Sequence, residues 1–241
     1  MSHGQHEHVR VICPPAVATL GTDGHRSGDG WLASRGPGQV FMMGDNSTLP
    51  VMPERPTLAD FFRRRLALDP FTTRHMLQSA RRAREQGMDD KVVLACLLHD
   101  ISVAVLLRSH HGHWGAQLVE PYVDEEVAWA IREHETLRYF PDESVGYGYP
   151  EAYSEFFGVE YRPPAHTRTA YEEARRHRWY MSARMVTIND LYTFDPEVEV
   201  DFREFEDVVG RHFRQPAEGL GFDGSPVAHM WRTMIWPNNF L

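Results

Sequence analysis

Cysteine is scarce in this sequence, because its 241 residues include only Cys13 and Cys96. Two cysteines do not make a disulfide framework, so a reducing compartment is the expected setting. Long hydrophobic runs are also lacking, and no apolar stretch approaches the length of a membrane-spanning helix. Residues 1–8 lack a charged start followed by an apolar run, so they are not expected to be a signal peptide. We expect a cytoplasmic protein that does not enter a membrane.

Positive charge is in short supply as well. Lysine and arginine number 25 against 34 aspartates and glutamates, which gives a formal net charge of −9. Nucleic acids and anionic membranes require basic surfaces, so neither is expected as the main partner. Arginines do cluster in residues 81–84 and 175–178, and we interpret both runs as solvated helix faces. The 42% hydrophobic and 24% charged fractions are ordinary for a globular protein.

Residues 1–55 differ from the rest of the chain. They hold eight of the 18 glycines and show no helical periodicity, which predicts an irregular, partly mobile N-terminal extension. Such an extension would suit an arm folded over a neighbouring subunit, so an oligomer is possible. Residues 56–241 are predicted to form one helical domain, which is long enough to bury a core.

Helical patterns dominate from Thr57 onward, and few segments alternate with the period of a strand. Thr57 is a suitable N-cap for a helix that Asp69–Pro70 would break. Thr72 or Thr73 would cap the next helix, which Gly87 stops. Asp89 or Asp90 would cap a third helix. The sequence predicts an all-α protein, with further helices near 114–120, 124–137, 165–194, 201–214 and 227–235.

Residues 91–100 form an apolar run that ends in His99–Asp100. A helix that is apolar on every face is normally buried, and a charged aspartate at its buried end needs a partner. A cation would suit, because both side chains are metal ligands. Taken alone, however, the pair is better explained as the polar end of a core helix that has reached the surface.

Further candidate ligands are spread over other predicted helices. Each residue by itself is explained as well by an ordinary polar contact, such as an aspartate paired with an arginine. The ordered set is more informative than its members, because it resembles the ligand pattern of the HD-domain superfamily over about residues 57–200. The set consists of His75, His99, Asp100, His111, His134 and Asp190.

Most members of that superfamily are phosphohydrolases in which one or two divalent metals activate water. A smaller branch contains mixed-valent di-iron oxygenases, namely myo-inositol oxygenase and oxygenases that cleave a hydroxylated aminoalkylphosphonate. This chain is more similar to the phosphonate-cleaving type. The similar features are the His75–Gln78 start with its spacing to His99, the segment His111–Leu118, and Arg138 four positions after His134.

The resemblance implies a helical HD-domain bundle in which Asp100 bridges an Fe(II)/Fe(III) pair. One iron would take the first two histidines and the last aspartate of the set, and the other iron would take His111 and His134. Dioxygen would be a co-substrate, and Arg138 would hold the anionic group of a small hydroxylated, phosphonate-like substrate. A cation just after a helix C-terminus, at the protein surface, explains Arg138 equally well.

The chain departs from that type in ways that leave the substrate open. It has no tyrosine before Tyr122, and its nearest arginine before Asp190 is Arg184, six positions back. Tyrosines of the loop at 141–164 would either line the pocket or pack within the loop; they are Tyr147, Tyr149 and Tyr153. The alternative function is a phosphohydrolase of a nucleotide or other phosphoester using Mn, Mg, Co or Zn, and a third is a non-catalytic HD-fold module.

Overall fold

The fold is helical, as predicted. A computed structural model describes residues 49–105, 110–151, 154, 158–192 and 195–235. Within these ranges there is no β-strand, only an isolated antiparallel bridge between Asp142 and Tyr147. Most of the predicted N-terminal extension and Tyr153 lie outside the described residues, whose helices include none long and apolar enough to cross a bilayer.

The first helices begin at well-defined caps. α3 (Leu58–Arg64) starts with a capping box, in which Thr57 and Asp60 each accept a hydrogen bond from the other's backbone N–H. The short 3-10 helix η1 (Leu66–Leu68) is followed by α4 (Pro70–Glu85). The predicted cap at Thr72 or Thr73 is wrong, because both residues lie inside α4. Asp69 caps α4 and Pro70 takes its first position, where a missing N–H costs nothing.

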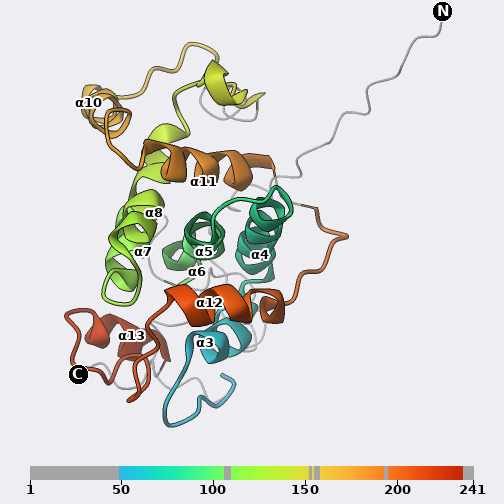
Figure 1. Cartoon of the computed structure of the whole chain (residues 1–241), viewed down its shortest axis with the longest axis vertical. Helices are drawn as coiled ribbons and strands as arrows, with labels where there is room; N and C mark the ends of the chain where they lie inside the picture. Colours follow the sequence, from blue (N-terminus) through green and yellow to red (C-terminus); the bar gives the residue numbers. More distant parts are fainter. Residues whose placement is uncertain (1–48, 106–109, 152–153, 155–157, 193–194, 236–241) are drawn as a thin grey trace, which may run out of the picture.

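The apolar run forms the centre of the bundle. α5 (Asp90–Leu98) begins after Asp89, and its residues Val92–Leu98 are all buried. It packs against α4, α8 (Glu125–Leu137), α11 (Tyr180–Tyr192) and α12 (Glu206–His212), which surround it in Figure 1. Contact on so many sides explains why α5 has no polar face. The chain continues into α6 (Ile101–Val105) and α7 (His111–Val119).

The long helix predicted for 165–194 is wrong. The chain forms α10 (Ala165–Ala174) and α11 instead, with a turn between them. In this turn His177 stacks on Trp129 of α8, with ring centroids 4.2 Å apart and planes at 18°. Arg178 lies over Trp179. Residues 175–178 are therefore part of a turn held by aromatic contacts, and not a solvated helix face.

The other arginine run also has structural partners. Arg81 pairs with Glu204 of η3 (Phe202–Phe205), and Arg84 pairs with Asp207 of α12 at 2.6 Å. These pairs join α4 to the segment that crosses it in Figure 1. The interpretation of residues 81–84 as a purely solvated face is therefore wrong for these two arginines.

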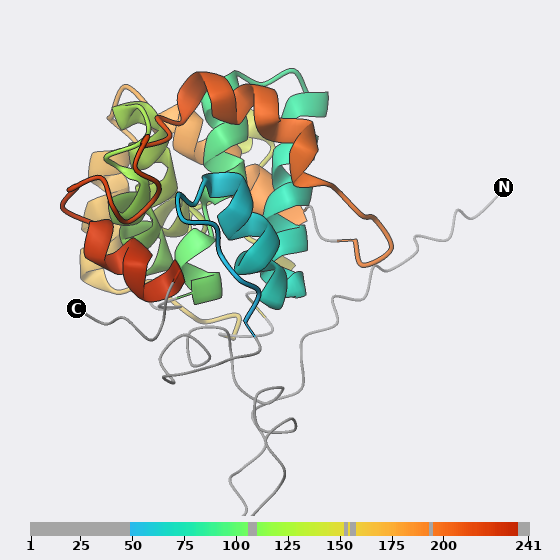
Figure 2. The same ribbon diagram turned by 90° about the horizontal axis from the view of Figure 1, so that it is seen from below.

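The C-terminal helix closes the lower end of the bundle. α13 (Ala228–Ile235) lies beside α3 in Figure 2, and Trp231 packs edge-on against Phe61 with centroids 5.0 Å apart. Arg65 is buried between them and donates to the carbonyls of Met234 and Ile235 at the end of α13. It also donates to the carbonyl of Pro50, so the start of the described chain is tied to the same helix end.

Candidate metal centre

All six predicted ligands converge on one place in the bundle. They come from α4 (His75), the end of α5 and the residue after it (His99 and Asp100), the start of α7 (His111), the last turn of α8 (His134) and α11 (Asp190). Their side chains form two groups that share Asp100, and within each group the candidate ligand atoms lie within 4.8 Å of one another. Residues up to 115 positions apart are thus brought into one cluster.

The first group lies on one side of Asp100. His75 Nε2 is 2.9 Å from Asp190 Oδ1 and 3.2 Å from His99 Nε2. Asp100 turns its Oδ2 toward this group, 3.6 Å from His99 Nε2 and 3.9 Å from His75 Nε2. Two nitrogens and two carboxylates therefore face a common point.

The second group lies on the other side of the same carboxylate. His111 Nε2 and His134 Nε2 are 3.2 Å apart. Asp100 turns its Oδ1 to them, at 3.4 Å from His111 and 3.9 Å from His134. Because each carboxylate oxygen faces a different group, Asp100 has the arrangement of a bridging ligand.

Backbone carbonyls set the orientation of two histidine rings. His99 Nδ1 lies 2.7 Å from the carbonyl of Cys96, and His134 Nδ1 lies 2.6 Å from that of Ile131. A carbonyl only accepts, so Nδ1 carries the proton in each ring and, in the neutral form, Nε2 offers a lone pair to the centre. The local helix turn therefore prepares both rings as ligands.

Close helix packing brings the second group together. A Cβ on Gly112 would lie 2.8 Å from the carbonyl oxygen of Arg132 and 2.9 Å from that of Ile131. Only glycine allows α7 to approach the backbone of α8 so closely. His111 precedes this glycine, and the contact explains how it meets His134.

Side-chain hydrogen bonds also tie the ligand-bearing elements to one another. Ser102 of α6 donates to the carbonyl of His111 at 2.9 Å, and Thr187 of α11 donates to the carbonyl of His134 at 3.0 Å. Ser79 of α4 donates to the carbonyl of Asn189 at 3.2 Å, next to Asp190. The backbone beside three ligands is thus held by buried hydroxyls.

The electrostatics of the cluster keep both carboxylates ionised. Burial would raise the pKa of Asp100, but His99 and His111 hold it at about 2. Burial also acts on Asp190, yet Arg138 and the hydrogen bonds from His75 and His99 keep its pKa well below the usual range. Two ionised carboxylates in a buried site favour the binding of a cation, and a metal ion would serve.

Two of the histidines, His99 and His134, have pKa values shifted in opposite directions. Burial lowers the pKa of His99, but Asp100 and Asp190 raise it to about 9. Burial and the neighbouring His111 hold the pKa of His134 well below its ordinary value. Without a metal, the proton on His99 therefore balances the carboxylates, and a bound cation would displace that proton.

Two observations show that the six candidate ligands suit a metal ion. Asp100 Oδ1 is buried and accepts no hydrogen bond in the structure, an arrangement that is costly unless another partner is present. Neutral His134 and its neighbour His111 bring their Nε2 atoms to 3.2 Å. Two nitrogens bound at about 2.1 Å to one ion at adjacent octahedral positions would lie roughly 3 Å apart. Imidazole and carboxylate suit iron, manganese, cobalt and zinc.

Arg138 lies at the rim of this cluster. It follows the last turn of α8, and its Nη2 donates to Asp190 Oδ2 at 2.8 Å, while its side chain is 17% exposed. The structure thus pairs Arg138 with a predicted ligand. Of the loop tyrosines, Tyr147 is buried and donates to the carbonyl of Arg138, so it packs within the loop. Tyr149 is half-buried and lies near Tyr139 and Tyr161.

One residue at the site, Glu135, was not predicted from the sequence. Glu135, next to His134, accepts from the backbone N–H of Gly112 at 3.2 Å and lies 3.6 Å from His111 Nδ1. Arg184, noted in the sequence only for its distance along the chain from Asp190, is fully buried and donates to Tyr180 and to the carbonyl of Leu137. The available signal for Glu135 was its position three residues before Arg138, whereas no local pattern indicates the burial of Arg184.

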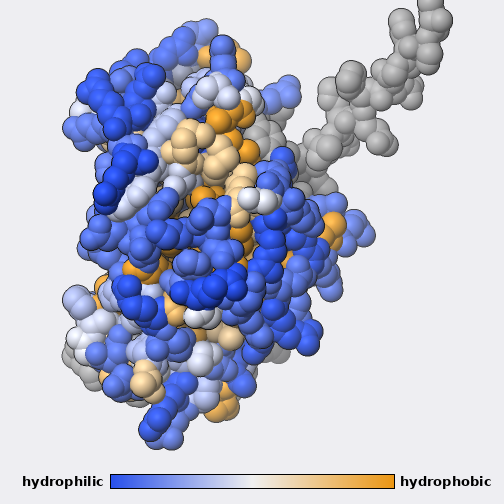
Figure 3. All heavy atoms as spheres, viewed as in Figure 1, coloured by the Kyte–Doolittle hydropathy of each residue, from blue (hydrophilic) through white to orange (hydrophobic). Residues whose placement is uncertain are grey.

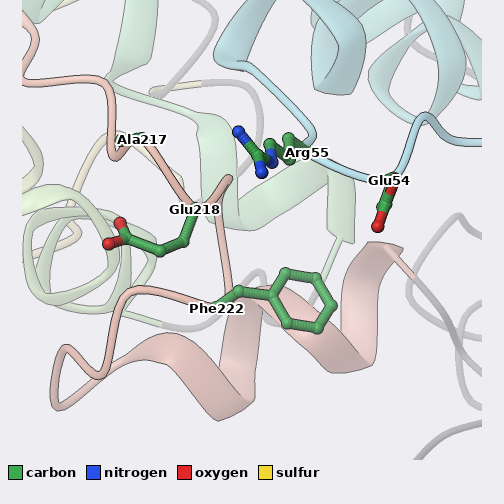
Figure 4. A pocket seen from close by; sticks show the side chains of 5 residues that line it. All are labelled: Glu54, Arg55, Ala217, Glu218 and Phe222. Carbon is green, nitrogen blue, oxygen red and sulfur yellow. The ribbon is translucent and has the colours of Figure 1, made fainter.

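Two surface cavities are formed by other residues. One, of about 560 Å³, is lined by Glu54, Arg55, Ala217, Glu218 and Phe222, and in Figure 4 Phe222 lies across the hollow from Arg55. The other, of about 550 Å³, lies between the ends of α3 and α4 and the residues around η3. Neither cavity is lined by any of the six candidate ligands.

Hydrophobic side chains also gather over α11 in Figure 3, where Met181 is 45% exposed.

Comparison with known proteins identifies one matching family. Residues 72–152 match the family model described as HD domain, which is 81 of the 241 residues. No curated protein matches the sequence. The matched segment runs from α4 through α8 into the following loop and contains five of the six candidate ligands, leaving out Asp190.

Proposed function

We propose that this protein is a dinuclear metal enzyme, because residues 72–152 match the HD domain. Domains of this family occur mainly in metal-dependent enzymes. More specifically, we propose an oxygenase that uses dioxygen and an Fe(II)/Fe(III) pair to oxidise or cleave a small hydroxylated substrate, anionic and phosphonate-like. The observation that carries the proposal is the division of Asp100 between two groups of ligands.

The ligand set supports two ions of unequal surroundings. One group has two histidines and Asp190, and the other has two histidines, with Asp100 common to both. Imidazole and carboxylate ligands in these numbers leave positions open for a substrate and a small co-substrate. When bound, an iron pair would supply the electrons that activate dioxygen, and the protein would supply position and charge.

The exposed side of the centre is where a substrate would approach. The side chains of His75, Asp100 and Arg138 are 12%, 14% and 17% exposed, whereas those of His99 and His134 are fully buried. The substrate would therefore approach the ligands beside Arg138. A guanidinium at this rim attracts an anionic group and orients it by hydrogen bonds, and the buried helices behind the ligands exclude water.

A phosphohydrolase is the second candidate, and the same Arg138 favours it. A cation beside two metal positions would serve equally to hold a phosphoester, whose hydrolysis requires only that the ions activate water. Manganese, magnesium, cobalt or zinc would then replace iron. The two candidates differ in their need for dioxygen.

Activity measurements with and without dioxygen separate the candidates. The protein is loaded with iron under low oxygen, and dioxygen uptake is followed with small hydroxylated phosphonates, carboxylates and sulfonates. In parallel, phosphate release from nucleotides and other phosphoesters is measured anaerobically with Mn, Mg, Co or Zn. The proposal expects substrate-dependent dioxygen uptake, whereas phosphate release without it would favour the hydrolase.

Two variants make the assay specific to the centre. Asp100→Asn removes the shared carboxylate charge and is expected to abolish turnover. His113→Ala is the matched control, because His113 is exposed and lies only two positions from His111. Equal loss of activity in both variants would argue against the assigned site.

A further inference from the structure

The end of α8 carries two opposite charges that contact the two ligand groups separately. Glu135 and Arg138 are three positions apart, so they lie on neighbouring positions of the helix surface. Glu135 Oε2 lies 3.6 Å from His111 Nδ1, whereas Arg138 Nη2 donates to Asp190 Oδ2 at 2.8 Å. One helix end thus places an anion beside one group and a cation beside the other.

The ligands alone would make the two metal positions unequal in charge. Asp190 belongs only to the first group, while Asp100 is shared. Counting ligands only, the first position has one more negative charge than the second. Arg138 offsets the charge of Asp190, and Glu135 adds a negative charge behind His111. With both included, the excess negative charge moves to the second position.

These charges are close enough to the ligands to matter. The side chains of Glu135 and Arg138 are 23% and 17% exposed, so solvent screens them less than it would screen surface residues. The distance from Glu135 to His111 Nδ1 is longer than a hydrogen bond, and its effect on the imidazole is therefore electrostatic. Arg138 makes a charged hydrogen bond to Asp190 directly.

Buried groups hold the helix end in place. The carbonyl of Leu137 accepts from Arg184 Nη1 at 3.0 Å, and the carbonyl of Arg138 accepts from the Tyr147 hydroxyl at 2.8 Å. Both donors belong to buried residues. The backbone from which Arg138 extends is therefore fixed on two sides, which suits a residue that must keep one orientation.

We propose that Glu135 and Arg138 are positioning residues that reverse the charge difference between the two metal positions. Glu135 strengthens cation binding at the His111–His134 position, and Arg138 weakens it at the His75–His99–Asp190 position. This inference rests on the proposed metal centre and adds that the two positions differ in their affinity for a cation.

The affinity of each metal position for cobalt(II) tests the proposed roles of Glu135 and Arg138 without any need for turnover. Metal-free protein is titrated with cobalt(II) in competition with a chelator, in two backgrounds that each isolate one position. His75→Ala leaves the His111–His134 position to be measured, and His111→Ala leaves the other. Two substitutions, Glu135→Gln and Arg138→Gln, are then introduced separately into each background. The glutamine at position 135 keeps an oxygen that can accept from Gly112 N–H.

The expected shifts have opposite signs. Glu135→Gln weakens cobalt(II) binding at the His111–His134 position by about ten- to a hundredfold, the usual cost of losing an outer partner of a ligand. Arg138→Gln tightens binding at the other position by roughly tenfold, on the same scale. Arg138→Lys, which keeps the positive charge, returns the affinity toward the wild-type value. The controls Glu133→Gln and Arg132→Gln, on the same helix, change neither position.

The outcomes separate this inference from the proposed function. A wild-type protein that fails to bind two cobalt(II) ions per chain overturns both. If two ions bind, an unchanged affinity in Glu135→Gln overturns the inference alone, and so does weaker binding in Arg138→Gln. Equal weakening of both positions by either variant also overturns it, because that is the result of a merely structural disturbance.

Discussion

Replacing Arg184 by methionine is expected to destabilise the fold substantially. The Arg184 side chain is fully buried; it donates to the Tyr180 hydroxyl at 3.0 and 3.1 Å and to the carbonyl of Leu137 at 3.0 Å. Tyr180 in turn donates to Asp142 at 2.6 Å. Methionine fills a similar volume but makes none of these bonds.

The size of the effect follows from what is left behind. Arg184 Nε also lies 3.8 Å from Asp142 Oδ2, so the two form an ion pair. Removing one member of a buried charged pair costs roughly 3–5 kcal/mol. Asp142 keeps its hydrogen bonds from Ser144 and Tyr180, and Leu137 keeps a backbone donor, Phe140 N–H, at 3.1 Å. The lower end therefore applies, and we expect the free energy of unfolding to fall by about 3 kcal/mol.

Urea unfolding measures this directly. With slopes of about 1–3 kcal/mol per molar, the midpoint should fall by roughly 1 M or more. Arg178→Met is the matched control, since Arg178 is exposed and lies over Trp179; we expect its effect to stay within about 0.5 kcal/mol. An Arg184→Met protein as stable as that control would refute the reasoning.

Four further predictions concern other parts of the chain. Gly112→Ala would push α7 away from the carbonyl of Arg132, which lies 2.8 Å from the added Cβ. The free energy of unfolding, measured with urea, should fall by about 1–3 kcal/mol; an unchanged midpoint would contradict the close approach. Asp100→Asn should lose the rise in melting temperature that metal addition gives the wild type, and a retained rise would speak against a shared ligand. Burial, followed by the hydrogen bond to Asp142, raises the pKa of Tyr180 to about 12. Since an unfolded tyrosine has a pKa of about 10, this contribution to stability is complete below about pH 10 and is lost as the pH rises toward 12; urea titrations across that range should show a shallower loss in Tyr180→Phe. Arg65→Met removes the buried donors to the end of α13 and should cost about 2–4 kcal/mol in the same assay, a loss that an unaltered midpoint would disprove.

Local signals in the sequence predicted much of the helical framework. Thr57 and Asp89 each cap the helix that follows them, as predicted, because an N-cap depends on a side chain a few residues from the N–H it accepts from. The apolar run ending at His99 predicted a buried central helix, and α5 is buried on all sides. Convergence of the six candidate ligands followed from the resemblance, which no single residue would have indicated.

Features that depend on distant contacts were not predictable. The helix break at 175–178 accompanies the stacking of His177 on Trp129, nearly 50 positions away. The role of Glu135 depends on the approach of α7 to α8 at Gly112. The pairing of Arg138 with Asp190 also joins residues 52 positions apart. In each case tertiary packing decides between local alternatives that the sequence leaves equal.

Low-temperature EPR of the iron-loaded protein tests the central claim most directly. The protein is loaded with iron under limited oxygen, partly oxidised, and analysed for metal content alongside the spectrum. A dinuclear centre with Asp100 as the bridge predicts two irons per chain and the signal of an antiferromagnetically coupled Fe(II)/Fe(III) pair, which Asp100→Asn should abolish. Iron present only as isolated ions, or a protein that retains manganese, magnesium or zinc and gives no coupled signal, would contradict the oxygenase.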